Sequence, residues 1–231
     1  MRIFCPRVTS AGSWLLLACL VLTAGCSPLN GSRDPQKAPR AQDQARAETI
    51  VFHLGDFPAG WYSQPSPDDS TAGSDDCLEP DMSDLTVHGE AQSDYFGSET
   101  DFAFSFASIF ESEADAHSAY DRYLERDLAT CVADAVSQGI EQAAKDDGQR
   151  TNTRTTSVQR IDLGSIGDRA QGYQARVEFT VGPTTIPAVI DFDIVQRERA
   201  IAMVAYLSVF HPSPAGLKTE LTGGVAQRME P

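Results

Sequence analysis

The chain has 231 residues, and its 33 Asp and Glu against 18 Lys and Arg give a net charge of −15 at pH 7. So large an acidic excess argues against a nucleic-acid-binding protein and against one that lies flat on an anionic membrane. It fits either a well-solvated acidic surface or a preference for a cationic ligand.

The N-terminal residues have the pattern of a secretory signal. Two arginines precede an apolar run, residues 14–22, whose length of about ten residues suits a signal core and is half of what a membrane span needs. The run closes in VLTAGC, residues 21–26, which resembles a bacterial lipobox. An ordinary signal peptide with a chance cysteine is the alternative. We expect residues 1–25 to be a lipoprotein signal peptide and Cys26 to be lipidated, which would anchor the chain in the lipid bilayer on the extracytoplasmic face of the cell membrane.

A tether is expected to follow the anchor. Residues 26–47 are rich in Pro, Ser, Gln, Arg and Ala and have almost no large apolar side chain, which predicts a lipidated disordered segment spanning about 25 Å. Residues 48–231 are long enough for one extracytoplasmic domain. We expect its order to begin with a short strand at Thr49–Leu54.

Two cysteines remain in the domain, because Cys5 and Cys19 leave with the signal and Cys26 is the anchor. In an oxidising compartment, the pair Cys77 and Cys131 favours a disulfide, which would stabilise the domain by roughly 3 to 4 kcal/mol. Two free thiols or a metal pair are the alternatives, although two cysteines without a nearby histidine make a poor zinc site.

The clearest strand lies within residues 95–110, where Phe102, Phe104 and Phe106 alternate with small residues. This asymmetry predicts a helix or second layer on the aromatic side of the sheet. Ser112 is a good N-cap for a helix that directly follows, and an apolar stripe runs along that helix until Gly139 can end it.

Four further strands are predicted at residues 153–163, 171–181, 186–196 and 200–210. Short turns join them, which requires antiparallel pairing, and the last run is apolar on both faces, which predicts a central position. Apolar residues four apart then indicate a terminal helix at Leu217–Val225. The sequence therefore predicts an α+β fold: an antiparallel sheet of five to six strands, with one long helix and a C-terminal helix packed on one face.

The sequence has none of the common catalytic or cofactor-binding patterns. It has no HExxH, GxSxG, Walker or GxGxxG motif, and its four histidines are isolated. The acidic loop at residues 63–84 lacks the ordered ligand spacing of an EF-hand. We therefore expect no catalytic residue, no metal ligand and no cofactor, and a protein that is not an enzyme.

Three segments carry a resemblance to a known family. Asp76-Cys77-Leu78, the helix start FESEADA at residues 110–116 and RERAIAMVA at residues 197–205 occur in the order found in the extracellular sensor domain of mycobacterial PknH-like kinases and related lipoproteins, which this chain resembles over about residues 50–229. That family implies an α+β domain with a cleft for a small molecule and a disulfide matching Cys77 with Cys131. Its usual second disulfide has no cysteines here. A PsbP-like lipoprotein domain is the second resemblance.

These observations predict a membrane-anchored sensor or small-ligand-binding domain that holds a small or apolar ligand between sheet and helix. The candidate lining residues are all aromatic: Phe102, Phe104, Phe106, Tyr120, Tyr123 and Tyr206. For each of them, simple filling of the core is the alternative interpretation. The alternative function is a structural or interaction lipoprotein that binds an envelope protein.

Overall fold

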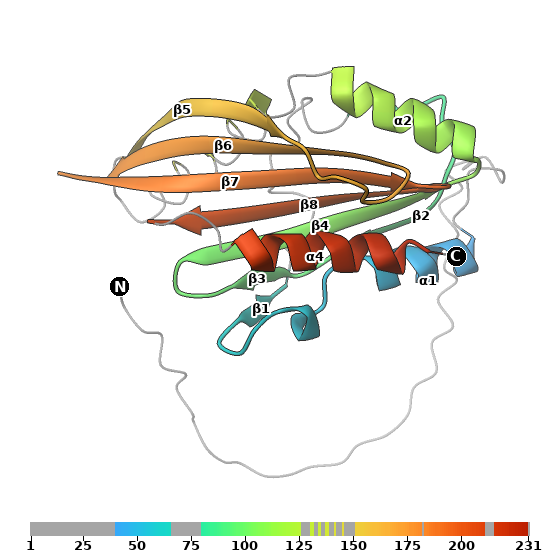
Figure 1. Cartoon of the computed structure of the whole chain (residues 1–231), viewed down its shortest axis with the longest axis horizontal. Helices are drawn as coiled ribbons and strands as arrows, with labels where there is room; N and C mark the ends of the chain where they lie inside the picture. Colours follow the sequence, from blue (N-terminus) through green and yellow to red (C-terminus); the bar gives the residue numbers. More distant parts are fainter. Residues whose placement is uncertain are drawn as a thin grey trace, which may run out of the picture. The chain divides into compact units, whose positions relative to one another are not determined.

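The computed structural model describes residues 40–65, 80–125, 151–181, 183–210 and 215–230, and single helical positions at 130, 131, 134, 137, 138, 141 and 145. The elements follow one another as α1 (Ala41–Ile50), the 3-10 turn η2 (Leu54–Asp56), β1 (Tyr62–Gln64), β2 (Val87–Gln92), β3 (Tyr95–Gly97), β4 (Asp101–Phe110), α2 (Glu113–Glu125), β5 (Thr151–Ile161), β6 (Arg169–Val181), β7 (Thr184–Arg197), β8 (Ala200–Val209) and α4 (Ala215–Arg228) (Figure 1).

The strands form one antiparallel sheet in the order β1-β3-β4-β8-β7-β6-β5. The eighth strand, β2, pairs with β4 on the same edge as β3, so β4 has two neighbours there: β3 beside Phe102 and Ala103, and β2 beside residues 106–110. β8 lies between β4 and β7, which confirms the predicted central position. The α+β class and the antiparallel pairing are confirmed, but the prediction of five to six strands is wrong: the sheet has eight, because β1 and β2 were not predicted and residues 95–110 form two strands, β3 and β4.

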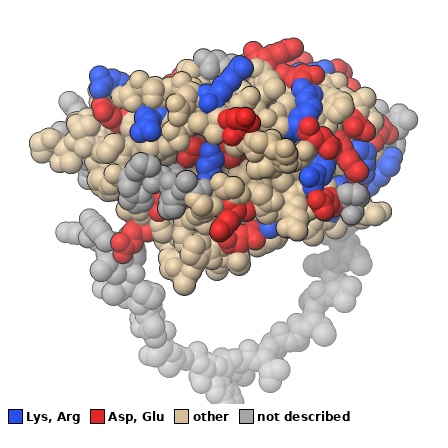
Figure 2. Space-filling view, viewed as in Figure 1, with Lys and Arg blue, Asp and Glu red and all other residues tan. Residues whose placement is uncertain are grey.

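Charged side chains of both signs are mixed over the face shown in Figure 2. Ion pairs join neighbouring strands, such as Arg154 with Glu178, and join the sheet to the C-terminal segment, such as Arg197 with Glu230. The acidic excess is therefore partly balanced locally where the acids meet arginines.

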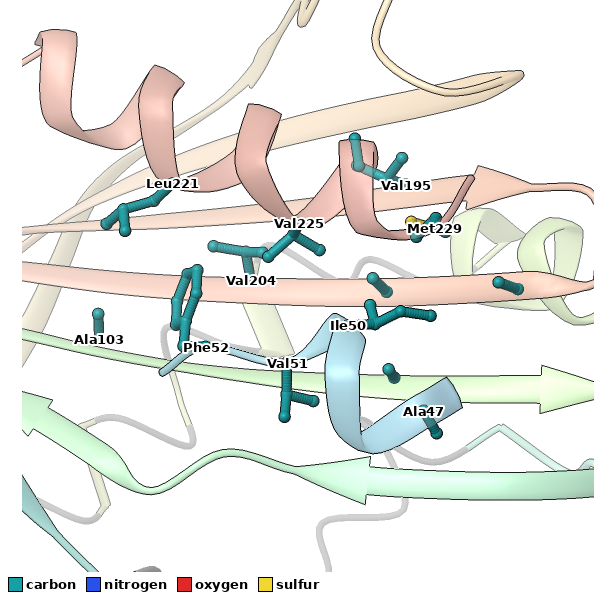
Figure 3. Close-up of a cluster of buried hydrophobic side chains, with 14 of the residues drawn as sticks. Ala47, Ile50, Val51, Phe52, Ala103, Val195, Val204, Leu221, Val225 and Met229 are labelled. Atoms are coloured by element: carbon teal, nitrogen blue, oxygen red, sulfur yellow. The ribbon is translucent and has the colours of Figure 1, made fainter. Parts of the chain in front are cut away.

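One face of the sheet is covered by α1 and α4. Leu221, Val225 and Met229 of α4 and Ile50 at the end of α1 are at most 3% exposed, and they pack over Val204 in the middle of β8 (Figure 3). Small residues of β4, Ala103 and Ala107 among them, lie beneath these side chains and let the helices approach closely. This layer contains one of the two hydrophobic cores of the domain.

The opposite face is covered by α2. Ala116, Ala119 and Tyr120 of that helix are buried in a second core with apolar residues of β6, β7 and β8. Phe104 packs at the border of this core, as the prediction of a helix on the aromatic side requires. The prediction that both helices pack on one face is wrong, because α2 and α4 cover opposite faces of the sheet.

The helix α1 corrects a second prediction. Residues 41–47, expected in the disordered tether, form most of this helix, and Thr49–Leu54, expected as a strand, contains the end of α1 and the start of η2. Ala47 and Ile50 are fully buried against the sheet, and Asp43 is 7% exposed. Helix formation here depends on this packing rather than on a strong apolar stripe.

The predicted start of α2 is confirmed. The backbone N–H of Asp115 donates to Ser112 Oγ at 3.0 Å, the hydrogen bond expected of an N-cap. The predicted continuation towards Gly139 passes through positions that lie largely outside the described residues. Within the described part of the chain, no helix is both long and apolar enough to cross a membrane.

Candidate functional site: a surface hollow at the edge of the sheet

A hollow of about 290 Å³ lies where the end of α1 and η2 meet the sheet edge formed by β1, β2 and β3. We call it the edge hollow and define it by its lining residues: Glu48, Val51, Phe52, His53, Leu54, Ser63, Ala91, Gln92, Ser93, Asp94 and Phe96. Its volume is near the lower limit of pockets that hold small organic ligands.

The floor of the edge hollow is apolar and firmly held. Phe52 and Phe96 are 2% and 3% exposed, and both contact Phe57, with ring centroids at 5.3 Å and 4.7 Å. The backbone N–H of Phe52 donates to Ser105 Oγ at 2.8 Å, which ties this segment to β4. Ser93 adds a buried hydroxyl that accepts from the backbone N–H of Ser105 at 2.9 Å.

The rim of the edge hollow is polar and exposed, and it contains two carboxylates. Glu48 accepts a hydrogen bond from Gln44 Nε2 at 3.1 Å, and Asp94 accepts one from Ser63 Oγ at 2.5 Å. The imidazole of His53 and the exposed side chain of Leu54 complete the side formed by η2.

The backbone that leads into the edge hollow is fixed by Arg228 of α4. Its guanidinium donates to the carbonyl oxygens of Ile50 and Val51, each at 3.1 Å from Nη2, and pairs with Asp56 at 3.0 Å. These bonds satisfy carbonyl groups that the end of α1 leaves without a helical partner. The wall formed by residues 51–54 is therefore held by the last helix of the chain.

A buried ionic cluster lies at the other end of α1. Asp43 accepts from Arg199 Nη2 at 2.9 Å, and its Oδ2 lies 3.4 Å from Nδ1 of His88, which is 1% exposed. The hydrogen bond from Arg199 lowers the pKa of the Asp43 carboxyl, and the positive charge of the guanidinium adds to that effect. Since His88 is buried, this cluster holds α1 against β2 and the turn between β7 and β8.

A second ionic cluster lies beneath α4. Lys218 Nζ is 2.9 Å from Asp191 Oδ1 and 3.3 Å from Asp193 Oδ1, and Thr222 Oγ1 donates to Asp193 at 2.7 Å. Desolvation raises the pKa of Asp193, and the nearby negative charge of Asp191 acts in the same direction. Both carboxylates are at most 2% exposed, so this cluster joins α4 to β7.

The predicted aromatic lining is only partly brought together. Phe102, Phe104 and Phe106 lie on the face of β4 that α2 covers, with Phe104 and Phe106 in edge-to-face contact at 5.6 Å. Tyr120 is 2% exposed beneath Arg169, whose guanidinium carbon is 4.3 Å from the ring centroid, and Tyr123 packs at the border of the same core. Phe102 is 39% exposed.

Tyr206 does not belong to that lining. It pairs with Ala103 across the ladder between β4 and β8 and is buried on the face covered by α1 and α4, where its ring centroid is 6.0 Å from that of Trp61. Burial raises the pKa of its phenol. The prediction that all six aromatic residues line one ligand site is therefore wrong, because the sheet separates Tyr206 from the other five.

Of the predicted covalent sites, Cys26 and Cys77 lie outside the described residues. Cys131 is 6% exposed and is packed at a helical position. Lipidation of Cys26 and a disulfide between Cys77 and Cys131 stay predictions.

Sequence reasoning missed the edge hollow. Its walls come from residues 48–54, most of which were predicted as a strand, and from β2 and β1, which were not predicted as strands. Glu48 and Asp94 are 46 positions apart, so their proximity has no local signal. Only the aromatic residues between Phe52 and Trp61 indicated that this part of the chain packs on the core.

No protein-family model matches the sequence, and no curated protein matches it. In the residues that the structure describes, no three His, Cys, Asp or Glu side chains are grouped so as to hold a metal ion.

Proposed function

We propose that this protein is a lipid-anchored extracytoplasmic lipoprotein whose folded domain binds a small ligand in the edge hollow and catalyses no reaction. A sensor or a carrier works in this way, because its output depends on occupancy rather than on turnover. The anchor part of the proposal rests on the lipobox-like sequence that ends at Cys26.

The observation that carries the ligand-binding part is the composition of the edge hollow. Buried aromatic rings lie beneath it, Leu54 and Ala91 present apolar surface in it, and a few polar groups form its rim. Small-molecule sites combine apolar surface, which provides affinity, with a few polar groups that orient the ligand. The backbone N–H of Phe52 is hydrogen-bonded to Ser105 of β4, and the carbonyl of Val51 to Arg228. The walls are therefore held in place before a ligand arrives.

The test of this proposal is native mass spectrometry of the full-length protein extracted in detergent from its own cell envelope. We expect a small molecule to stay bound to the wild-type protein and to be lost from Ala91→Phe, whose larger side chain would occupy the edge hollow. Ala170→Phe is the matched control, because Ala170 is also half-buried on the same sheet face but does not line the hollow.

Urea unfolding of both variants would show whether the larger side chain is tolerated. Ligand-free wild-type protein would contradict the proposal, and so would a ligand that Ala91→Phe retains in full.

A second function, binding of an envelope protein partner, is favoured by one end of the sheet. Phe102 is 39% exposed and Phe210 is 61% exposed, and the strand ends that carry them are joined by a hydrogen bond from the N–H of Val209 to the carbonyl of Thr100. Phe210 also has a φ of 72°, a backbone conformation that bulky residues rarely adopt. One stoichiometric protein in the same preparation, with no small molecule, would favour this function.

A further inference from the structure

Two carboxylates on the rim of the edge hollow, Glu48 and Asp94, form no ion pair with any residue that the structure describes. The groups that donate to Glu48 and Asp94, the amide of Gln44 and the hydroxyl of Ser63, are both uncharged. No Lys or Arg is among the described residues that line the hollow.

Two arginines of the helices beside the hollow bond to other groups. Arg228 is paired with Asp56, and Nη2 of Arg46 donates to the carbonyl of Met229 at 2.6 Å. Carboxylates in the two ionic clusters contrast with those of the rim, since Asp43 is paired with Arg199 and Asp191 with Lys218.

A site with this charge attracts a cation. The field of a whole chain with net charge −15 acts in the same direction and favours the approach of positively charged ligands. The lining adds a second requirement, because the exposed side chain of Leu54 and the half-buried Ala91 present apolar surface that a small hydrated metal ion would not use.

We infer that the ligand of the edge hollow is a small organic cation: an ammonium group or a similar positively charged head on an apolar body. The head lies between Glu48 and Asp94 at the rim, and the apolar body lies against Leu54 and Ala91. This inference rests on the proposed function and adds the chemical class of the ligand.

Three probes that share one benzene ring and differ in charge test the inference: phenethylammonium, 2-phenylethanol and 3-phenylpropionate. Binding to the full-length protein in detergent is measured by isothermal titration calorimetry at low ionic strength. We expect the cation to bind best and the anion worst. We also expect high salt to weaken binding of the cation and to leave binding of the alcohol unchanged, because salt screens exposed charges.

Charge-removing variants identify the carboxylates that are responsible. Glu48→Gln and Asp94→Asn should each weaken binding of phenethylammonium by about three- to fivefold, the range of a partly exposed ion pair, without affecting 2-phenylethanol. Asn at position 94 keeps an acceptor oxygen for Ser63. Glu220→Gln is the matched control, because Glu220 is an exposed acid on α4 that does not line the hollow.

The outcomes separate the inference from the proposed function. If the alcohol or the anion binds as tightly as the cation, or if Glu48→Gln and Asp94→Asn bind phenethylammonium as wild type does, the inference is wrong, while a ligand site in the hollow remains. If none of the probes binds, the inference is also wrong, and the proposed function then depends on the envelope-derived ligand alone. If phenethylammonium binds equally well to Ala91→Phe, the hollow is not the site and both fail.

Discussion

Two buried carboxylates, Asp43 and Asp193, lie in opposite electrostatic surroundings on the same face of the sheet. Asp43 accepts a hydrogen bond from the guanidinium of Arg199, which lowers the pKa of the Asp43 carboxyl. Asp193 and Asp191 both pair with the single ammonium group of Lys218. Desolvation raises the pKa of Asp193. The two residues should therefore make stability depend on pH in opposite directions.

The pH dependence of unfolding tests this contrast. An unfolded Asp has a pKa of about 3.9. The folded pKa of Asp193 is higher than this unfolded value. The contribution of Asp193 to stability is therefore fully present below the unfolded pKa and is lost as the pH rises through the folded pKa. For Asp43, with a lowered folded pKa, the contribution is present above about 3.9 and is lost as the pH falls through the folded pKa.

Urea unfolding of wild type, Asp193→Asn and Asp43→Asn across a series of pH values is the measurement. The stability of wild type relative to Asp193→Asn should decrease as the pH rises above about 4, and that relative to Asp43→Asn should decrease as the pH falls below about 4. Parallel curves for the two variants would contradict the assignment.

The aromatic residues also show which side-chain positions could be predicted from the sequence and which could not. The alternation that predicted β4 assigned Phe102, Phe104 and Phe106 correctly to one face. It did not say which face of β8 carries Tyr206, because both faces of that strand are apolar and only the pairing with Ala103 decides. A shift of one residue in register would move Tyr206 to the other side of the sheet.

At the scale of elements, α1 is held on the sheet by a close approach to β2. A Cβ added to Gly89 would lie 2.4 Å from the backbone C and O of Asp43, so only glycine fits there. The side chain of Gln44 then hydrogen-bonds the backbone of Glu90 in both directions, at 2.7 Å and 3.2 Å. None of this was predictable from the polar sequence of α1, whose helix depends on a partner 46 positions away.

Substitution of Gly89 tests this packing. Gly89→Ala should lower the free energy of unfolding by about 1 to 3 kcal/mol, because the backbone of α1 must move to admit the methyl group. Gly223→Ala on α4 is the control: a Cβ there meets nothing within 4 Å, and the better helix propensity of alanine should stabilise by about 0.5 to 1 kcal/mol. Urea denaturation midpoints measure both, and equal midpoints for Gly89→Ala and wild type would refute the close approach.

At the scale of the whole molecule, strands with a clear hydrophobic pattern were predicted correctly, and strands with a weak pattern were not. β4 and the run from β5 to β8 follow clear alternation or apolar runs with short turns, and the structure confirms all five strands. β1 and β2 are short, and the two buried positions of β2 are His88 and Gly89, neither of which is a large apolar residue. The edge hollow is built from these weak segments, so it could not be predicted before the fold was known.

The proposed anchor is also a property of the whole molecule. In Cys26→Ala the protein should move almost completely from the membrane fraction to the soluble extracytoplasmic fraction, because position 26 no longer has a thiol that can carry acyl chains. Fractionation followed by immunoblotting measures this, and mass spectrometry of the wild-type N-terminal peptide should show the lipid. Continued membrane association of Cys26→Ala would contradict the anchor.

The first and the last described helices share one core, since α1 and α4 pack side by side on the sheet and Arg46 and Arg228 bond across from each helix to the other's end (Figure 1). A chain without residues 215–230 would leave Ile50 of α1 and Val204 of β8 open to water on this side of the sheet. Docking of the first helix therefore depends on the last, and the two should unfold together.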